Sequence, residues 1–162
     1  VGIANDAPAL FPLGDTTVTW TATDADGNQG MDTQTVTIVD TIPPDFELVL
    51  TPNELWPPNH KLVSIEADIQ MLTDVCDAAP AVRLVSITSN EPDDGLGDGD
   101  TAGDVQGADF GQDDRTFLLR AERSGRGNGR AYTITYVAED ASGNETSKQA
   151  TVTVPKSRSG QS

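Results

Sequence analysis

Residues 18–39 read VTWTATDADGNQGMDTQTVTIV, and residues 133–154 read TITYVAEDASGNETSKQATVTV. In both stretches an aromatic residue, Trp20 or Tyr136, is followed four residues later by Asp, then by Ala-x-Gly-Asn, and finally by a segment that alternates Thr with Val or Ile. Asp, Gly and Asn favour a tight turn, and alternation of apolar and polar residues is typical of a half-buried strand. Each copy therefore predicts a β-hairpin, and the repetition predicts two related domains.

A pair of prolines separates the two domains. Pro43 and Pro44 follow the first hairpin, and because proline cannot donate a ladder hydrogen bond, we expect the sheet to stop there. The predicted boundaries are a C-terminal part of one domain at 1–40, a stiff linker at 41–44, a complete domain at 45–156 and a polar tail at 157–162.

The second domain contains many short segments with strand periodicity and none with helical periodicity. Such a series, interrupted by Gly and Pro, predicts an all-β sandwich. The first domain has only two clear strands and a third candidate at 9–13. Since an isolated hairpin is marginal in water, we expect another chain to complete it by strand pairing. The strand candidates of the second domain are 46–50, 62–71, 82–88, 105–110, 116–123, 131–138 and 147–154.

The composition excludes several classes of function. The formal net charge is −16, with 26 acidic and 10 basic residues, and such a surface repels nucleic acids and anionic membranes. No apolar run is long enough to span a bilayer. The single cysteine, Cys76, and the single histidine, His60, cannot supply an intrachain disulfide or a typical zinc site. No nucleophile and base can be paired into a catalytic constellation, so we expect a protein that is not an enzyme.

Several motifs resemble the hyalin repeat, an immunoglobulin-like module of extracellular proteins. The first copy carries Phe-Pro-Leu-Gly at 11–14, the hairpin signature at 17–28, and Asp40 ahead of the proline pair. The second domain is similar to a longer relative in large secreted bacterial proteins, with its motifs at 55–61, 89–92 and 119–123. The resemblance implies a partial immunoglobulin-like unit followed by one complete immunoglobulin-like sandwich. It also implies an extracellular or cell-surface location, in a bacterial protein, and a structural or adhesive use.

An acidic segment at 90–114 is the best candidate for a metal site. Its crowded carboxylates repel one another, and a calcium ion, which prefers oxygen ligands, would relieve that repulsion and order the loop. The alternative is a solvated loop that pairs with Arg120, Arg123, Arg126 and Arg130. The predicted calcium ligands are Asp93, Asp94, Asp98, Asp100, Asp104 and Asp109.

The motif Asp24-Ala25-Asp26-Gly27-Asn28 also resembles the start of a calcium loop. The second copy keeps Asp140 but has Ser142 where the first has Asp26. A turn explains both copies and a metal explains only one, so we favour the turn.

Trp56 and His60 flank a proline pair and could form a platform for a sugar or a peptide. The alternative, which we favour, is that Trp56 is buried as a plug at the end of the sandwich and that a carboxylate satisfies His60. For Cys76 the alternatives are a small buried hydrophobe, which we favour, and intermolecular pairing.

The sequence thus predicts a non-catalytic extracellular module that is stabilised by calcium and that assembles with other chains or with further repeats of the parent protein. A homo-oligomer is one form of this assembly. The competing hypothesis is a carbohydrate-binding accessory module of a secreted hydrolase.

Overall fold

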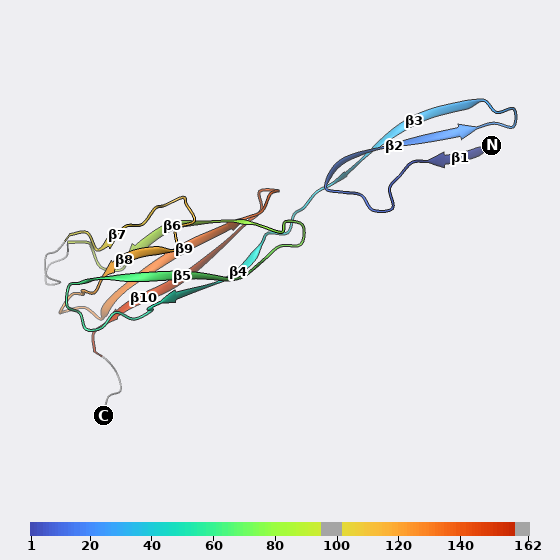
Figure 1. Cartoon of the computed structure of the whole chain (residues 1–162). Coiled ribbons are helices and arrows are strands. Elements are labelled where there is room, and N and C mark those ends of the chain that lie inside the picture. The colour runs from blue at the N-terminus through green and yellow to red at the C-terminus, as the bar shows by residue number, and fades with distance from the viewer. Residues whose placement is uncertain (95–101, 158–162) are drawn as a thin grey trace. The chain divides into compact units, whose positions relative to one another are not determined.

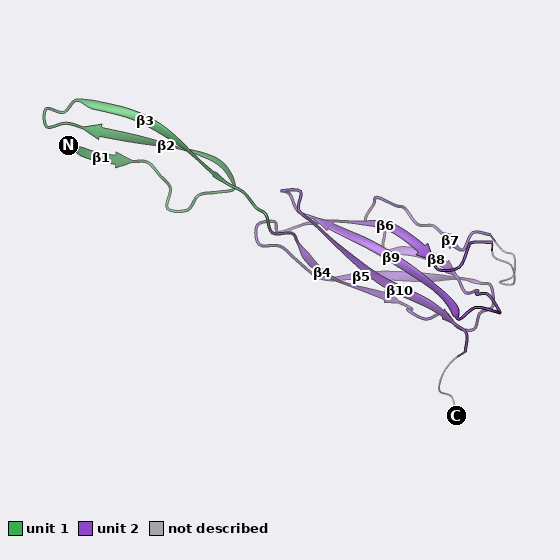
Figure 2. Cartoon of the chain, turned by 180° about the vertical axis from the view of Figure 1, so that it is seen from behind, with its two compact units in different colours: residues 1–41 green, residues 42–162 purple. Residues whose placement is uncertain are grey.

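The computed structural model describes residues 1–94 and 102–157 and divides the chain into two compact units. Unit 1 comprises Val1–Thr41 and unit 2 comprises Ile42–Ser162, which Figure 2 shows in green and purple. The division falls between Thr41 and Ile42, inside the segment that we expected to be a linker.

Unit 1 is a single antiparallel sheet with the strand order β1-β2-β3. The strands are β1 (Gly2–Asn5), β2 (Gly14–Thr23) and β3 (Gln29–Ile38), so the expected hairpin forms. The candidate third strand at 9–13 is wrong, because that segment has no strand structure and β1 pairs with β2 instead.

One face of the unit 1 sheet is apolar, and we call it the open face. Paired residues and alternate residues of a strand point to the same side of a sheet, so the register assigns six apolar side chains to this face. Only one of them, Val18, is buried. The six are Ile3, Val18, Trp20, Ala22, Val36 and Ile38.

Unit 2 is a β-sandwich made of two antiparallel sheets, with strand orders β10-β9-β6 and β4-β5-β8-β7, and Figure 1 shows them as two layers. Together with unit 1 this confirms the all-β prediction; no helix occurs in the ranges 1–94 and 102–157. The strands are β4 (Asp45–Thr51), β5 (Leu62–Thr73), β6 (Ala81–Ser89), β7 (Val105–Gln106), β8 (Thr116–Arg120), β9 (Gly129–Glu139) and β10 (Glu145–Pro155).

The core of unit 2 lies between these two sheets. Strand β9 is central in its sheet and contributes side chains that solvent does not reach, because β6 and β10 flank it and the second sheet covers it. Two predicted strands are shorter than expected: the one at 105–110 is only Val105–Gln106, and the one at 116–123 ends at Arg120. The fully enclosed core residues include Phe46, Ile65, Leu84, Phe117, Leu119, Tyr132, Ile134, Tyr136 and Val152.

Candidate functional site

The described ends of the acidic loop are fixed to the sandwich by their own aspartates. Asp93 accepts hydrogen bonds from two backbone amides of the returning chain, that of Gly103 at 3.0 Å and that of Asp104 at 2.6 Å. The carboxylate thereby closes the loop at its base, where β7 begins.

Asp104 lies between two arginines in the interior of the sandwich. It is 2 % exposed, its Oδ2 forms an ion pair with Arg130, and its Oδ1 lies 3.4 Å from Nε of Arg120. Arg120 also donates to the carbonyls of Ala102 and Gly103. A buried charge is tolerated when it is paired and hydrogen-bonded. Asp104 meets both conditions at Oδ2, whereas its Oδ1 and Nε of Arg120 are paired with each other but form no hydrogen bond among the described residues.

Arg130 is the centre of the buried cluster, with no exposed surface on its side chain. Besides Asp104, it contacts Glu91 through Nε at 3.4 Å and the carbonyl of Pro92 through Nη2 at 3.0 Å. Its Nη1 donates to the hydroxyl of Tyr132, which in turn donates to the carbonyl of Arg120. Burial raises the pKa of Tyr132, and the neighbouring arginine only partly opposes this shift, so the phenol remains a neutral donor.

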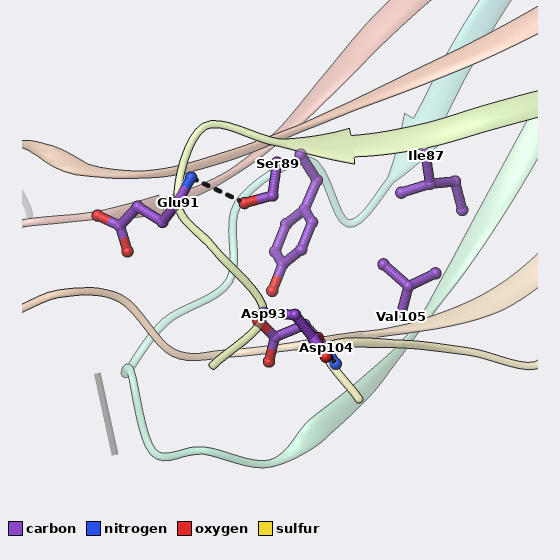
Figure 3. A pocket seen from close by; sticks show the side chains of 7 residues that line it. Ile87, Ser89, Glu91, Asp93, Asp104 and Val105 are labelled. Atoms are coloured by element: carbon purple, nitrogen blue, oxygen red, sulfur yellow. Dashed lines mark hydrogen bonds between the residues drawn. The ribbon is translucent and has the colours of Figure 1, made fainter. Parts of the chain in front are cut away.

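A hollow of about 210 Å³ borders this cluster. Figure 3 shows Ile87 and Val105 on one side of it and the acid groups of Asp93 and Asp104 close to one another on another side. The carboxylates in its wall are engaged by the arginines and backbone amides described above, so the cluster neutralises much of the charge that it presents. Its lining residues are Ile87, Ser89, Glu91, Asp93, Asp104, Val105 and Tyr132.

The six predicted calcium ligands do not share one environment. Asp94 and Asp109 are exposed, and Asp98 and Asp100 lie outside the described residues. Within the described part of the chain, Asp93, Asp94, Asp104 and Asp109 do not form a group of three carboxylates close enough to hold one ion. The contact between Asp104 and both arginines shows the pairing that we gave as the alternative, and the calcium site stays a prediction.

A different pair of carboxylates in unit 2 lies close together. Oxygen atoms of Asp74 and Asp140 are within 4.8 Å of one another. The Oδ1 of Asp74 accepts from the amides of Cys76 and Asp77, whereas its Oδ2 is buried and has no hydrogen-bond partner among the described residues. This pair is not predicted from the sequence, because the two aspartates are far apart in the chain.

The Asp-Ala-x-Gly-Asn motif forms the same turn in both units. In each copy one carboxylate oxygen accepts two backbone amides and the other accepts the Asn side chain, at 2.8–2.9 Å. The glycine has φ near +87° in both copies, a value that few other residues adopt. The bond from Asn28 lowers the pKa of Asp24. At Asp140 burial acts to raise the pKa, but the bonds from Asn144, Ser142 and Gly143 together outweigh it and the pKa is lowered.

His60 is satisfied by a buried carboxylate. Its Nδ1 lies 3.0 Å from Oε2 of Glu122, which is completely buried, while half of the His60 side chain remains exposed. Its carbonyl accepts from Arg120 and its amide donates to Ala121. These contacts fix the loop after β4 onto the end of β8 and agree with the alternative to a ligand platform.

The prediction that Trp56 is a buried plug is wrong, because 39 % of its surface is exposed. The neighbouring Leu55 occupies the core position instead, at 2 % exposure, and its amide donates to the carbonyl of Thr153. Adjacent residues of an extended segment point to opposite sides, so the residue after Leu55 faces outward. The favoured interpretation of Cys76 is also wrong, since its side chain is exposed.

Arg120, Arg130 and Asp104 are among the candidate residues of the sequence, but the contacts of Glu91 and Tyr132 with them are not predicted by it. The usable signal was a charged residue, Arg130, at a position of β9 that the alternation assigns to the buried face. A buried charge requires a partner, but the partner is distant in the sequence and the pattern does not identify it.

Comparison of the chain with models of protein families, with curated proteins and with solved structures found no match. No helix in the described residues is long and apolar enough to cross a membrane.

Proposed function

We propose that the chain is a non-catalytic structural or adhesive module, made of immunoglobulin-like repeats of the hyalin-repeat type, from an extracellular bacterial protein. The observation that carries this proposal is the reuse of one hairpin, with the same turn and the same pairing, in both units. Serial repetition of a small β-unit is typical of proteins that extend or link surfaces.

The assembly that we propose uses the exposed edges of unit 1. Strand β3 is a ten-residue edge strand, and an edge of this length offers unpaired backbone groups to another strand. A neighbouring chain, which in a homo-oligomer is a second copy, would pair there by strand addition.

Sedimentation at micromolar concentration tests the assembly. Thr33 and Thr35 of β3 are exposed, so changing both to Glu adds charge to the edge without altering the core. We expect the unaltered chain to self-associate and this variant to be monomeric. The matched control replaces Gln149 and Thr151, the corresponding positions of β10, and should associate as the unaltered chain does. A monomeric unaltered chain would contradict the proposal.

Calcium is a separate part of the proposal. Titration calorimetry with millimolar calcium should give a heat of binding that Asp94→Asn with Asp109→Asn removes, if the acidic loop is the site. Asp74→Asn is the matched control, since a loss of heat in that variant would place the ion near Asp140 instead. If neither the unaltered chain nor any variant gives a heat of calcium binding, the loop is a solvated acidic segment held by Arg120 and Arg130.

The exposure of Trp56 favours a second candidate, a carbohydrate-binding accessory module. Aromatic rings that remain partly exposed can stack on sugars. Retention on immobilised polysaccharides should then be lost in Trp56→Ala and kept in Trp20→Ala. Equal retention of both variants would remove this candidate.

A further inference from the structure

The sheet of unit 1 reproduces one sheet of unit 2 strand by strand. In unit 1, β2 pairs with β1 and β3; in unit 2, β9 pairs with β6 and β10. Trp20 is opposite Asn5 as Tyr136 is opposite Leu84. The turns of the two hairpins also have the same hydrogen bonds, so β1-β2-β3 corresponds to β6-β9-β10.

The corresponding faces differ in what covers them. Tyr136 and Ala138 are inaccessible to solvent, whereas Trp20 is 39 % exposed and Ile3, the counterpart of Val82, is 71 % exposed. A mainly apolar hollow of about 350 Å³ borders the open face and extends to Thr21 and Met31, which the register places on the opposite face. Its lining residues are Ile3, Trp20, Thr21, Ala22, Gly30, Met31 and Asp32.

In unit 2 this face is covered by the second sheet, with β4 and β5 supplying Phe46, Leu50, Ile65 and Ala67 to the common core. Strands β7 and β8 of that sheet lie in the connection between β6 and β9, at 90–128. The corresponding connection of unit 1, at 6–13, is too short to contain two strands and a crossing of the sandwich. Of the strands that cover this face in unit 2, only β4 and β5 can therefore have counterparts on the open face. In unit 2 these two strands precede the first strand of the covered sheet, β6.

The charges of unit 1 favour the same occupant. The register places Asp32 on the open face and unit 1 has no basic side chain, so a second copy of unit 1 docked there would bring no positive side chain to Asp32. Asp32 corresponds to Lys148, and in unit 2 Nζ of Lys148 lies 2.9 Å from Oδ1 of Asp45 at the start of β4. Unit 1 thus has a negative charge where unit 2 has a positive one. A strand that covers the open face would need a positive charge opposite Asp32.

We propose that the open face packs against a two-stranded β-ribbon that resembles β4–β5, precedes β1 in the chain, and carries a Lys or Arg opposite Asp32. The ribbon would fill the hollow against Trp20 and convert the single sheet of unit 1 into a two-layered sandwich. This inference uses only the geometry and charge of the two sheets, and it stands whether or not the adhesive role or calcium binding is correct.

The test adds a ribbon to the complete chain. A second copy of residues 45–80 is placed ahead of Val1, either unchanged or with Asp45→Lys in the added copy. Hydrogen exchange followed by mass spectrometry then reports the protection of β2 and β3, while β9 and β10 show that unit 2 is folded. We expect roughly tenfold or greater slowing of exchange in β2 and β3, with the Lys version slower than the Asp version.

The charge argument is tested separately by adding Asp32→Lys to both fused chains, which should reverse their order. Equal exchange of β2 and β3 with and without the ribbon would overturn the proposal, and so would an order that does not reverse. A dimer of the unfused chain that persists when Thr33→Glu and Thr35→Glu block the edge of β3, with protection of β2 that grows with concentration, would overturn it in favour of a second copy on the open face.

Discussion

The hairpins β2–β3 and β9–β10 have the same turn and the same pairing, yet one has an exposed apolar face and the other lies in a core. Trp20 keeps 39 % of its surface exposed and its counterpart Tyr136 keeps none. The residues of the hairpin therefore determine the turn and the register, whereas burial depends on a second sheet formed by other parts of the chain. A local motif can be repeated faithfully without repeating the energetic role of its side chains.

The difference has a direct consequence for stability. A single sheet of three strands has one apolar face without a partner, while two packed layers bury both inner faces. We therefore expect unit 2 to unfold cooperatively and unit 1 to contribute much less to the free energy of unfolding. The predictions below compare matched residues of the two regions.

The largest effect is expected at Tyr136. Truncation of a fully buried aromatic leaves a cavity and removes apolar contacts, so Tyr136→Ala should destabilise unit 2 by about 3–5 kcal/mol. Trp20→Ala should leave the unfolding of unit 2 unchanged. Urea unfolding followed by circular dichroism measures both.

Tyr136→Phe is the control for this prediction. It keeps the ring but removes the hydroxyl, which donates to the carbonyl of Asp114 at 2.5 Å, so the loss should be about 1 kcal/mol. If Trp20→Ala destabilised unit 2 as much as Tyr136→Ala does, the contrast between the two hairpins would be refuted.

The next effect is expected in the buried ionic cluster, which has no counterpart among the charged residues of unit 1. Arg130→Met fills a similar volume but leaves Asp104 and Glu91 without a major partner, and should cost about 3 kcal/mol because a buried charge loses its compensation. Arg126→Met, at an exposed position, should change the stability by no more than about 0.5 kcal/mol.

A double-mutant cycle separates the ion pair from the packing of Arg130. Asp104→Asn combined with Arg130→Met should be less destabilised than the sum of the two single variants. Strict additivity in urea unfolding would mean that Arg130 acts only by filling space.

The sequence predicted the two hairpins and the strands of the unit 2 core because alternation and turn residues are local signals. It did not locate β1, since Gly2–Asn5 has little alternation and is held only by its pairing with β2. It also predicted that Trp56 is buried, because aromatic residues are scarce and the proline loop is stiff, whereas Leu55 is the residue that enters the core. The cluster around Arg130 joins residues from distant segments, and no periodicity encodes such contacts.

A smaller effect distinguishes Leu55 from Trp56. Leu55→Ala should destabilise unit 2 by about 2 kcal/mol or more, because the side chain is in the core. Trp56→Ala should cost less, since a large part of its ring is already in water. Thermal unfolding of the two variants provides the measurement, and a larger shift for Trp56→Ala would restore the plug interpretation.

The smallest effects concern the two turn aspartates and their response to acid. The pKa values of Asp24 and Asp140 in the folded chain are below the ordinary value of 3.8. A carboxyl with a lowered folded pKa stabilises the fold above its unfolded pKa, and this contribution is lost as the pH falls through the folded pKa. Between pH 5 and pH 2, stability should therefore fall less steeply in a variant that lacks the titrating group.

Asp140→Asn and Asp24→Asn test this response in the two units separately. Asn keeps one acceptor oxygen for the turn amides but does not titrate, so each variant should flatten the pH dependence of its own unit and leave the other unchanged. Hydrogen exchange resolved by strand, with β9 and β10 reporting unit 2 and β2 and β3 reporting unit 1, separates the two responses. At Asp140 burial opposes the lowering of the pKa by the turn bonds, and at Asp24 the exposed position lets solvent screen the same bonds, so both flattenings should be small. An unchanged pH dependence of β2 and β3 in Asp24→Asn, and of β9 and β10 in Asp140→Asn, would show that the turn carboxylates do not contribute to the acid sensitivity.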